Sequence, residues 1–406
     1  MKENQEKIIR LSEYIQGLMK DEERRQLYDR YKKDFENVTP QEIFGAFHIL
    51  LEKGIEPKEL LVILDKVINV FYKALSTYEW KKPEKDSFLD FLMKENHALI
   101  VKLEGIKELL EEKDLQARKE GLIPGIKELL GFNAHYLKKE NILFPYLEKK
   151  MDKFSGVAIM WSLHDMARAQ IKKTIECLET ENCNEAALNE QMGSLLFVLY
   201  GLVKKEELIL FPAASEVIEK NEWAEMQKQS VEYDFPFIKR PKLQPESFQE
   251  SESGKDRSTE MNGTCTFKTE TGELDFEQIL MVFNALPVDL TFVDENNKVK
   301  YFTRPKDRIF PRSAAIIGRD VDKCHPPESV HVVHKIVDSF RAGKQDTATF
   351  WINMNGKTIL IQYFALRNAK GEYKGVLEAS QDITEIKSLD GERRLLKWEE
   401  EDIERS

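Results

Sequence analysis

The sequence contains few cysteines and no apolar stretch long enough to cross a bilayer. Its four cysteines among 406 residues include no C-x-x-C pair, which predicts reduced thiols in a cytoplasm and not a disulfide scaffold. The N-terminus, MKENQEKIIR, lacks the apolar core of a secretory signal peptide. The longest apolar run, near SLLFVLYGLV, is too short for a membrane span. We therefore expect a soluble cytoplasmic protein that has no membrane partner.

An excess of positive charge is also missing. The chain has 61 Lys and Arg residues against 72 Asp and Glu residues, a formal net charge of −11. Because binding to nucleic acid needs clustered positive charge, we expect no nucleic-acid partner. The hydrophobic share of 41% and the charged share of 33% are typical of globular domains. A chain of this length predicts roughly two to four domains.

Hydrophobic periodicity of the helical type covers the first half of the chain. Apolar residues at helical spacing and a break at GIEP (54–57) predict a small helical domain over residues 1–80. Four long helices with short connections follow, which predicts an up-and-down four-helix bundle over residues 84–228. We expect Pro124 to open the second of these helices. The four helices are expected at roughly 86–113, 123–150, 156–181 and 185–220.

The second half of the chain changes in composition and period. A polar stretch rich in Pro, Ser and Glu cannot bury enough surface to fold, which indicates a flexible linker over residues 229–272. Alternating apolar residues and turn signals at Asn296-Asn297 and Asn355-Gly356 then predict antiparallel hairpins with a helix between them. We expect an α+β sensory domain over residues 273–388 and a polar C-terminal tail over 389–406.

Side chains of the type that bind metals recur within the predicted bundle. The segments KKENILFP in the second helix and KKEELILFP in the fourth are an internal echo, and alignment on Phe-Pro matches Glu140 with Glu207. Residues equidistant from an antiparallel turn lie at the same height. His97 on the first helix, His164 on the third and both echo segments therefore fall in one layer, within about two helical turns.

Helical spacing also predicts which of these side chains point into the core. Glu95, Glu140, His164 and Glu206 lie on apolar faces, whereas His97 and His135 lie at the edges of theirs and Glu207 lies next to Glu206. Histidines and carboxylates on facing helices build di-iron and di-manganese sites in bundles, because buried carboxylates need a partner. The alternative is that His164 is a hydrogen-bonded core histidine and that the KKEN and KKEE segments are solvated.

These residues resemble the hemerythrin-like, HHE cation-binding proteins. The whole chain resembles the family catalogued as domain of unknown function 438, which joins a short helical domain, a hemerythrin-like four-helix bundle and a PAS domain. Its most specific segments are KENHAL, HYLKKENILFPYLE, MWSLHDMAR, KKEELILFP, LPVDLTFVDENNKVKYF, IFPRSAAIIGRDVDKCHPPESVHVVHKI and VLEASQDIT. The resemblance implies a non-haem iron site, with one or two irons or with manganese. Its implied ligands are His135, Glu140, His164 and Glu206 or Glu207, to which the bundle layer adds Glu95 and His97.

The sequence departs from the hemerythrin pattern at three places, each of which lacks an expected histidine. The residues found there are Leu202 and Val203 on the fourth helix, Arg168 on the third, and Ser87 and Asp90 on the first. The low histidine count argues against reversible oxygen binding and favours a carboxylate-rich site.

The resemblance also implies a C-terminal PAS domain whose ligand is unknown. Its histidines and its nearby cysteine lack a zinc spacing, and the prolines of CHPP suit the start of a helix, so we interpret this cluster as structural. The alternative is a haem or metal ligand, since His331 and His334 lie one turn apart on a predicted helix. The cluster comprises Cys324, His325, His331 and His334.

The predicted function is that of a cytoplasmic sensor or signal-relay protein that responds to oxygen, nitric oxide or redox state. A di-iron stress-repair protein and a metal-free interaction scaffold with a degenerate site are the alternatives. The sequence has no nucleophile–base pair, Gly-rich phosphate loop or kinase motif, so we predict no catalytic residues. We expect a homodimer formed through the PAS domain and the tail from residue 384, and a downstream signalling partner.

Overall fold

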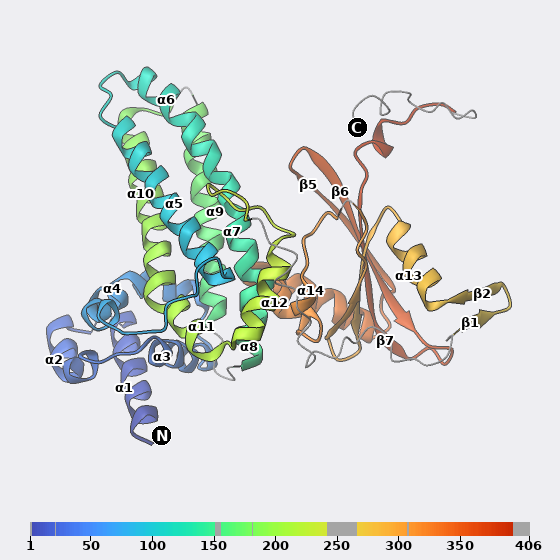
Figure 1. The fold of residues 1–406 in the computed structure, drawn as a ribbon, viewed down its shortest axis with the longest axis horizontal. Coiled ribbons are helices and arrows are strands. Elements are labelled where there is room, and N and C mark those ends of the chain that lie inside the picture. The colour runs from blue at the N-terminus through green and yellow to red at the C-terminus, as the bar shows by residue number, and fades with distance from the viewer. Residues whose placement is uncertain are drawn as a thin grey trace. The chain divides into compact units, whose positions relative to one another are not determined.

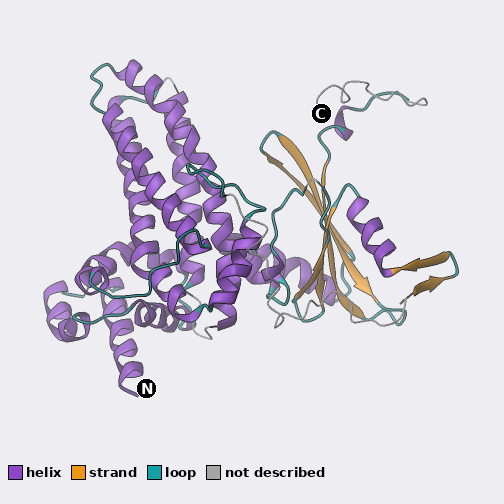
Figure 2. Ribbon diagram, in the orientation of Figure 1, coloured by secondary structure: helices purple, strands orange, loops and turns teal. Residues whose placement is uncertain are grey.

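The computed structural model describes residues 2–20, 22–150, 156–180, 182–241, 266–306 and 308–392. The chain divides into two compact units. The first comprises Met1–Asp256 together with Pro311–Val333, and the second comprises Arg257–Phe310 together with His334–Ser406. The first unit is helical, and the second is built on a five-stranded sheet (Figures 1 and 2).

Four helices precede the bundle. They are α1 (Lys2–Met19), α2 (Arg24–Phe35), α3 (Pro40–Glu52) and α4 (Pro57–Ser76). Helix α3 begins where the Thr39 side chain accepts a hydrogen bond from the Glu42 amide and the Glu42 carboxylate accepts one from the Thr39 amide. The helical N-terminal region is therefore confirmed. Its apolar side chains join the hydrophobic core of the bundle, so these helices belong to the same unit.

The bundle consists of four long helical stretches that run side by side (Figure 1). The first is α5 (Phe88–Leu109) and the third is α9 (Val157–Glu179). The second is continuous from α6 (Leu115–Glu128) through η1 (Leu129–Phe132), α7 (Asn133–Lys138) and η2 (Lys139–Leu143) to α8 (Phe144–Lys150). The fourth runs from α10 (Glu185–Lys205) through η3 (Glu206–Leu210) to α11 (Phe211–Val217). Both η2 and η3 are π-helical turns.

The second helix of the bundle begins earlier than the sequence predicts. The Asp114 carboxylate accepts a hydrogen bond from the Ala117 amide and so caps α6 at Leu115. Pro124 consequently lies inside this helix and does not open it. The other three helices begin within about two residues of their predicted starts, which is the usual uncertainty of helix ends.

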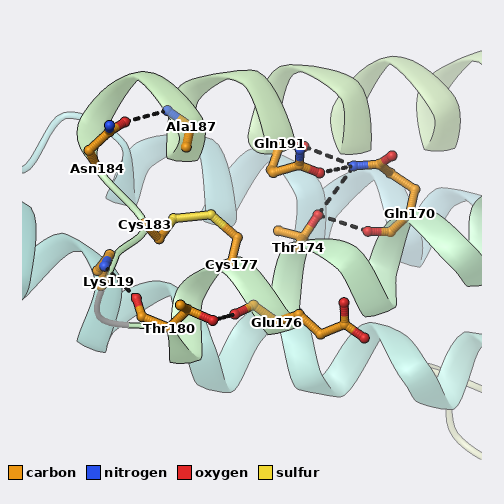
Figure 3. The surroundings of a disulfide bond; sticks show 10 residues. All are labelled: Lys119, Gln170, Thr174, Glu176, Cys177, Thr180, Cys183, Asn184, Ala187 and Gln191. Carbon is orange, nitrogen blue, oxygen red and sulfur yellow. Dashed lines mark hydrogen bonds between the residues drawn. A yellow bond between two sulfur atoms is a disulfide. The ribbon is translucent and has the colours of Figure 1, made fainter.

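A disulfide bond joins Cys177 near the end of α9 to Cys183 before α10 (Figure 3). The expectation that the cysteines are reduced differs from the structure at this pair. The α9–α10 turn brings the two Cα atoms to 5.4 Å, although six positions separate the cysteines in the sequence. Asn184 caps α10 directly after the disulfide by accepting a hydrogen bond from the Ala187 amide.

The second unit contains an antiparallel sheet in the order β4-β3-β7-β6-β5. Its strands are β3 (Asp289–Asp294), β4 (Val299–Phe302), β5 (Thr347–Met354), β6 (Lys357–Arg367) and β7 (Tyr373–Asp382). Asn297 and Asn355 have positive φ angles of 61° and 52°, as the predicted hairpin turns require. A separate hairpin of β1 (Thr266–Thr269) and β2 (Gly272–Asp275) leads into α13 (Phe276–Ala285). Other elements of the described residues are η5 (Ala314–Ile316), η6 (Val321–Cys324), α14 (Pro327–Arg341) and η7 (Ile386–Ser388).

Structure extends into the region predicted to be a linker. Helix α12 (Lys220–Ser230) is followed by Tyr233 and Phe235, which are buried, and by Phe237, whose ring stacks on Phe132. Residues 242–265 of the predicted linker and 393–406 of the predicted tail lie outside the described residues. Among the described helices, none has the length and apolar composition that crossing a membrane requires.

Candidate metal centre

Five ionisable side chains from all four bundle helices meet in the core. They are Glu95 from α5, His135 from α7, Glu140 from η2, His164 from α9 and Glu206 from η3. Each is at most 1% exposed to solvent. The layer that the sequence predicts therefore contains these five residues in the structure. Hydrogen bonds join them in two sets, and 3.9 Å separates the sets between His164 and Glu206; we call the five residues together the network.

Half of the network is centred on His135. Its Nδ1 atom lies 2.7 Å from Glu95 Oε2, and its Nε2 atom lies 3.0 Å from Glu206 Oε2. The Asn96 amide donates a further hydrogen bond of 3.1 Å to Glu206 Oε2. Both ring nitrogens of His135 are thus engaged by carboxylates, although the sequence places this residue only at the edge of its helix face.

The other half of the network is centred on His164. Its Nδ1 atom lies 2.7 Å from Glu140 Oε1, so an N–H at Nδ1 donates to this carboxylate. Burial and the charge of Lys139 lower the pKa of His164, which favours the neutral ring. In that tautomer Nε2 carries a lone pair. Among the described residues, Nε2 is buried without a hydrogen-bond partner, and it lies 3.9 Å from Glu206 Oε1.

Aromatic rings fix the orientation of the His164 imidazole. Tyr136 stacks on it with 4.7 Å between ring centroids, and Phe144 stacks at 5.8 Å. The Tyr136 hydroxyl and the Asn96 Oδ1 atom are also buried without a hydrogen-bond partner. Buried polar atoms are normally satisfied. Within the described part of the chain these three atoms are exceptions, and each is open to a hydrogen bond with a further polar group.

Three cations balance the three buried carboxylates, and sequence reasoning missed this role for all of them. Lys138 bonds Glu95, Lys139 bonds Glu206 Oε1, and Arg168 donates two hydrogen bonds of 2.9 Å to Glu140. Arg168 occupies the position where the resemblance implies a histidine. The paired lysines of both echo segments were the signal in the sequence that could have suggested these ion pairs.

Glu140 and Glu206 are strongly biased toward their charged forms. Burial opposes ionisation of Glu140, but the hydrogen bond from His164 and the charge of Arg168 outweigh it and lower the pKa of Glu140 to about 2. Burial likewise opposes ionisation of Glu206, yet the charge of Lys139 holds its pKa well below the usual range. Burial lowers the pKa of Lys139, and the charge of Glu206 opposes this change.

The two π-helical turns explain the echo in the sequence. In η2 the Phe144 amide donates to the Lys139 carbonyl, and in η3 the Phe211 amide donates to the Glu206 carbonyl. Each turn ends immediately before Phe-Pro, so Lys139 and Glu206 occupy equivalent positions and pair with each other. π-helical turns of this kind are frequent at functional sites.

Two of the predicted ligands lie outside this network. Glu207 matches Glu140 in the echo but is only partly buried, and burial together with the charge of Glu206 raises its pKa. His97 is exposed and lines a surface hollow with Val101 and Phe237. The structure therefore brings together five of the seven predicted residues, and His97 and Glu207 lie outside the buried network.

The donor atoms of the network are of the kinds that bind metal ions, but their arrangement fits a metal ion less well. Imidazole nitrogen and carboxylate oxygen suit iron and manganese, and His164 Nε2 is open toward Glu206. In the part of the chain that is described, however, no group of three or more His, Cys, Asp or Glu side chains is arranged to hold a metal. Lys139 bonds the Glu206 oxygen that faces Nε2, so a metal ion at this place requires this ammonium group to move.

Comparison with known proteins defines the two folded parts. Residues 87–214 match the hemerythrin HHE cation binding domain, and residues 279–384 match the PAS domain. The chain therefore carries a hemerythrin HHE domain and a C-terminal PAS domain, which confirms the predicted fold class. This pair of domains fits a sensor or signalling protein. The resemblance to domain of unknown function 438 stays a prediction, as do the domain boundaries.

Three solved structures that are similar to this chain each cover less than a third of it. A C-terminal domain from Streptococcus mutans is 32% identical over 31% of this chain and 98% of its own, with a TM-score of 0.30. A PAS domain from Colwellia psychrerythraea is 17% identical over 27% and 97%, with a TM-score of 0.23. The PAS domain of BvgS from Bordetella pertussis is 16% identical over 28% and 88%, with a TM-score of 0.23. No curated protein matches the chain.

Proposed function

We propose that this protein is a cytoplasmic sensor or signal-relay protein whose hemerythrin domain binds non-haem iron, or manganese, and whose PAS domain passes on the resulting change. The observation that carries the proposal is the buried Nε2 atom of His164. It has a lone pair, no hydrogen-bond partner and a carboxylate oxygen 3.9 Å away. Oxygen, nitric oxide and redox state are the signals that such a centre would sense.

The chain's own residues divide into ligands and supporting groups. His164 Nε2 and Glu206 are the first donors available to an ion, while Glu140 orients His164 through Nδ1. A carboxylate on the far nitrogen of a ligating histidine is the usual outer partner and raises ligand basicity. Glu95 and His135 act through Glu206. A bound iron would supply one-electron redox chemistry in a core that excludes water.

Metal analysis after anaerobic reconstitution with Fe(II) tests this function. We expect roughly one metal ion per chain in the wild-type protein, because His164 Nε2 and Glu206 are the first donors available to an ion. His164→Ala should lose most of the metal, whereas His97→Ala, which removes an exposed histidine, should keep it. Circular dichroism of both variants separates loss of a ligand from loss of folding. Wild-type protein that stays free of iron and manganese would refute the proposal.

A metal-free interaction scaffold is the second candidate, and the charge balance of the core favours it. Each of the three buried carboxylates already has a cationic partner, so none of them needs a metal ion to compensate its charge. The same reconstitution separates the two functions. A scaffold would bind no metal, and its thermal stability would not respond to Fe(II) or Mn(II).

A further inference from the structure

The π-helical turn that carries Glu140 leaves backbone carbonyl groups without helical partners. The Phe144 amide, which would bond the Glu140 carbonyl in an α-helix, bonds the Lys139 carbonyl instead. The next residue, Pro145, has no N–H group, so it cannot serve the carbonyls of Glu140 or Asn141. Buried backbone carbonyls need donors, and this turn must obtain them from elsewhere.

Residues Pro311–Val333 supply these donors. Within the first unit, Arg319 Nη1 donates to the Glu140 carbonyl at 3.2 Å, and the Ser313 hydroxyl donates to the Asn141 carbonyl. Both contacts therefore fall on the turn that positions a central carboxylate of the candidate metal centre.

Ion pairing holds this segment firmly on α8. Arg319 is 5% exposed and makes a two-pronged ion pair with Glu148, with distances of 2.9 and 2.8 Å. Lys149 donates a hydrogen bond of 3.1 Å to the Ala315 carbonyl in η5. Paired N–H···O bonds from arginine to a carboxylate fix geometry as well as adding free energy.

The same segment belongs to the PAS domain in sequence. It lies within residues 279–384, which match that domain, and it joins β4 to α14. One stretch of chain is thus covalently part of the PAS domain and folded as part of the bundle unit. The equivalent turn η3 on the fourth helix packs against α3 and α4 instead.

We propose that Pro311–Val333 is a relay segment that couples the hydrogen-bond state of Glu140 to the PAS domain, with Arg319 as its positioning residue. The carboxylate of Glu140 is bound by His164 and Arg168, while its carbonyl is bound by Arg319. A change of partner at the carboxylate shifts the π-helical backbone and alters the Arg319 contact. Coupling between two sites is reciprocal, so a change at Arg319 must also alter the turn.

Hydrogen–deuterium exchange on the metal-free, full-length protein tests the relay, because none of these contacts involves a metal ion. Arg319→Ala should speed exchange roughly tenfold at amides of residues 139–148, because it removes charged hydrogen bonds that hold the turn closed. Exchange at 206–212, the equivalent turn, should not change. The matched control is Arg10→Ala, which removes a two-pronged ion pair with Asp34 in the N-terminal helices.

The reciprocal arm perturbs the Glu140 carboxylate and measures exchange at residues 311–333. Glu140→Gln, and the milder Arg168→Lys in case the first variant unfolds, should speed exchange in this segment severalfold. In an Arg319→Ala background the same substitutions should cause no further increase in exchange at residues 311–333. A purely structural role for Arg319 would not give this result. Unchanged exchange of 311–333 in both variants, or of 139–148 in Arg319→Ala, would overturn the relay. If the protein does not bind iron, the expected results of both exchange experiments stay the same.

Discussion

Substitution of Lys139 by methionine tests how the buried network is stabilised. Methionine keeps an unbranched side chain of similar length and removes the ammonium group that bonds Glu206. Breaking a buried ion pair by removing one partner costs about 3–5 kcal/mol. Glu206 keeps its contacts with His135 and Asn96, so we expect the lower end of this range, about 3 kcal/mol.

The assay is thermal unfolding of the metal-free protein followed by circular dichroism. A loss of about 3 kcal/mol in a unit of this size lowers Tm by about 6–12 °C. Lys205→Met is the matched control, because Lys205 is also buried and pairs with Asp65. The Asp65 side chain is 37% exposed, so water solvates it when the lysine is lost, and the expected cost is about 1 kcal/mol.

The comparison of the two lysine variants is decisive. Equal Tm values for Lys139→Met and Lys205→Met, or a Lys139→Met protein within about 2 °C of wild type, would refute the view that Lys139 compensates a buried carboxylate. Addition of Mn(II) extends the test to the proposed function. If the metal ion and the ammonium group compete for Glu206, Mn(II) should raise the Tm of Lys139→Met more than that of the wild-type protein.

Three further predictions concern acid stability, the disulfide and self-association. The folded-state pKa of Glu140, about 2, lies below its usual value of 4.5, so its contribution of about 3 kcal/mol is present above pH 4.5 and lost as the pH falls toward 2. Urea unfolding at a series of pH values should show this loss in the wild type and not in Glu140→Gln. Reduction of Cys177–Cys183 should lower the free energy of unfolding by about 2 kcal/mol, because the bond closes a short loop. A Cys177→Ser/Cys183→Ser protein that still responds to reductant would contradict this. Helix α13 exposes 59% of Met281 and has no buried residue, so Met281→Asp should weaken the predicted PAS homodimer in analytical ultracentrifugation. A wild-type monomer at tens of micromolar would exclude that dimer.

Most of the fold could be predicted from local sequence patterns. Helical spacing of apolar residues identified the bundle, because a helix that buries one face must repeat apolar residues at that period. The hairpin at Asn355-Gly356 was equally visible, since both residues adopt the positive φ angles that its turn needs. Pro124 was misinterpreted as a helix start because the capping role of Asp114 was not recognised.

The candidate metal centre was only partly predictable. Helical spacing placed Glu95, Glu140, His164 and Glu206 on the core faces of their helices. Counting from turns placed polar groups of the four helices at one height, since antiparallel helices fix which heights coincide. Counting does not tell whether a carboxylate is matched by a metal ion or by a lysine, because long lysine side chains reach the core from positions beside the apolar face. The pairing of Lys139 with Glu206 therefore became evident only in the structure.

The sequence by itself thus determined the two domain types, the course of their helices and strands, and the layer of acidic residues and histidines, since all of these follow from local period and from distance to a turn. The tertiary structure alone decided the π-helical turns, the Cys177–Cys183 bond and the place of Arg319. The π-helical turn η2 and the place of Arg319 depend on groups remote in sequence, and the disulfide depends on the α9–α10 turn that brings the two cysteines together. In a π-helical turn an amide bonds the carbonyl five residues back, which leaves other carbonyls of the turn without a helical donor. Buried carbonyls need donors from elsewhere in the chain, and those donors are in place only after the chain has folded.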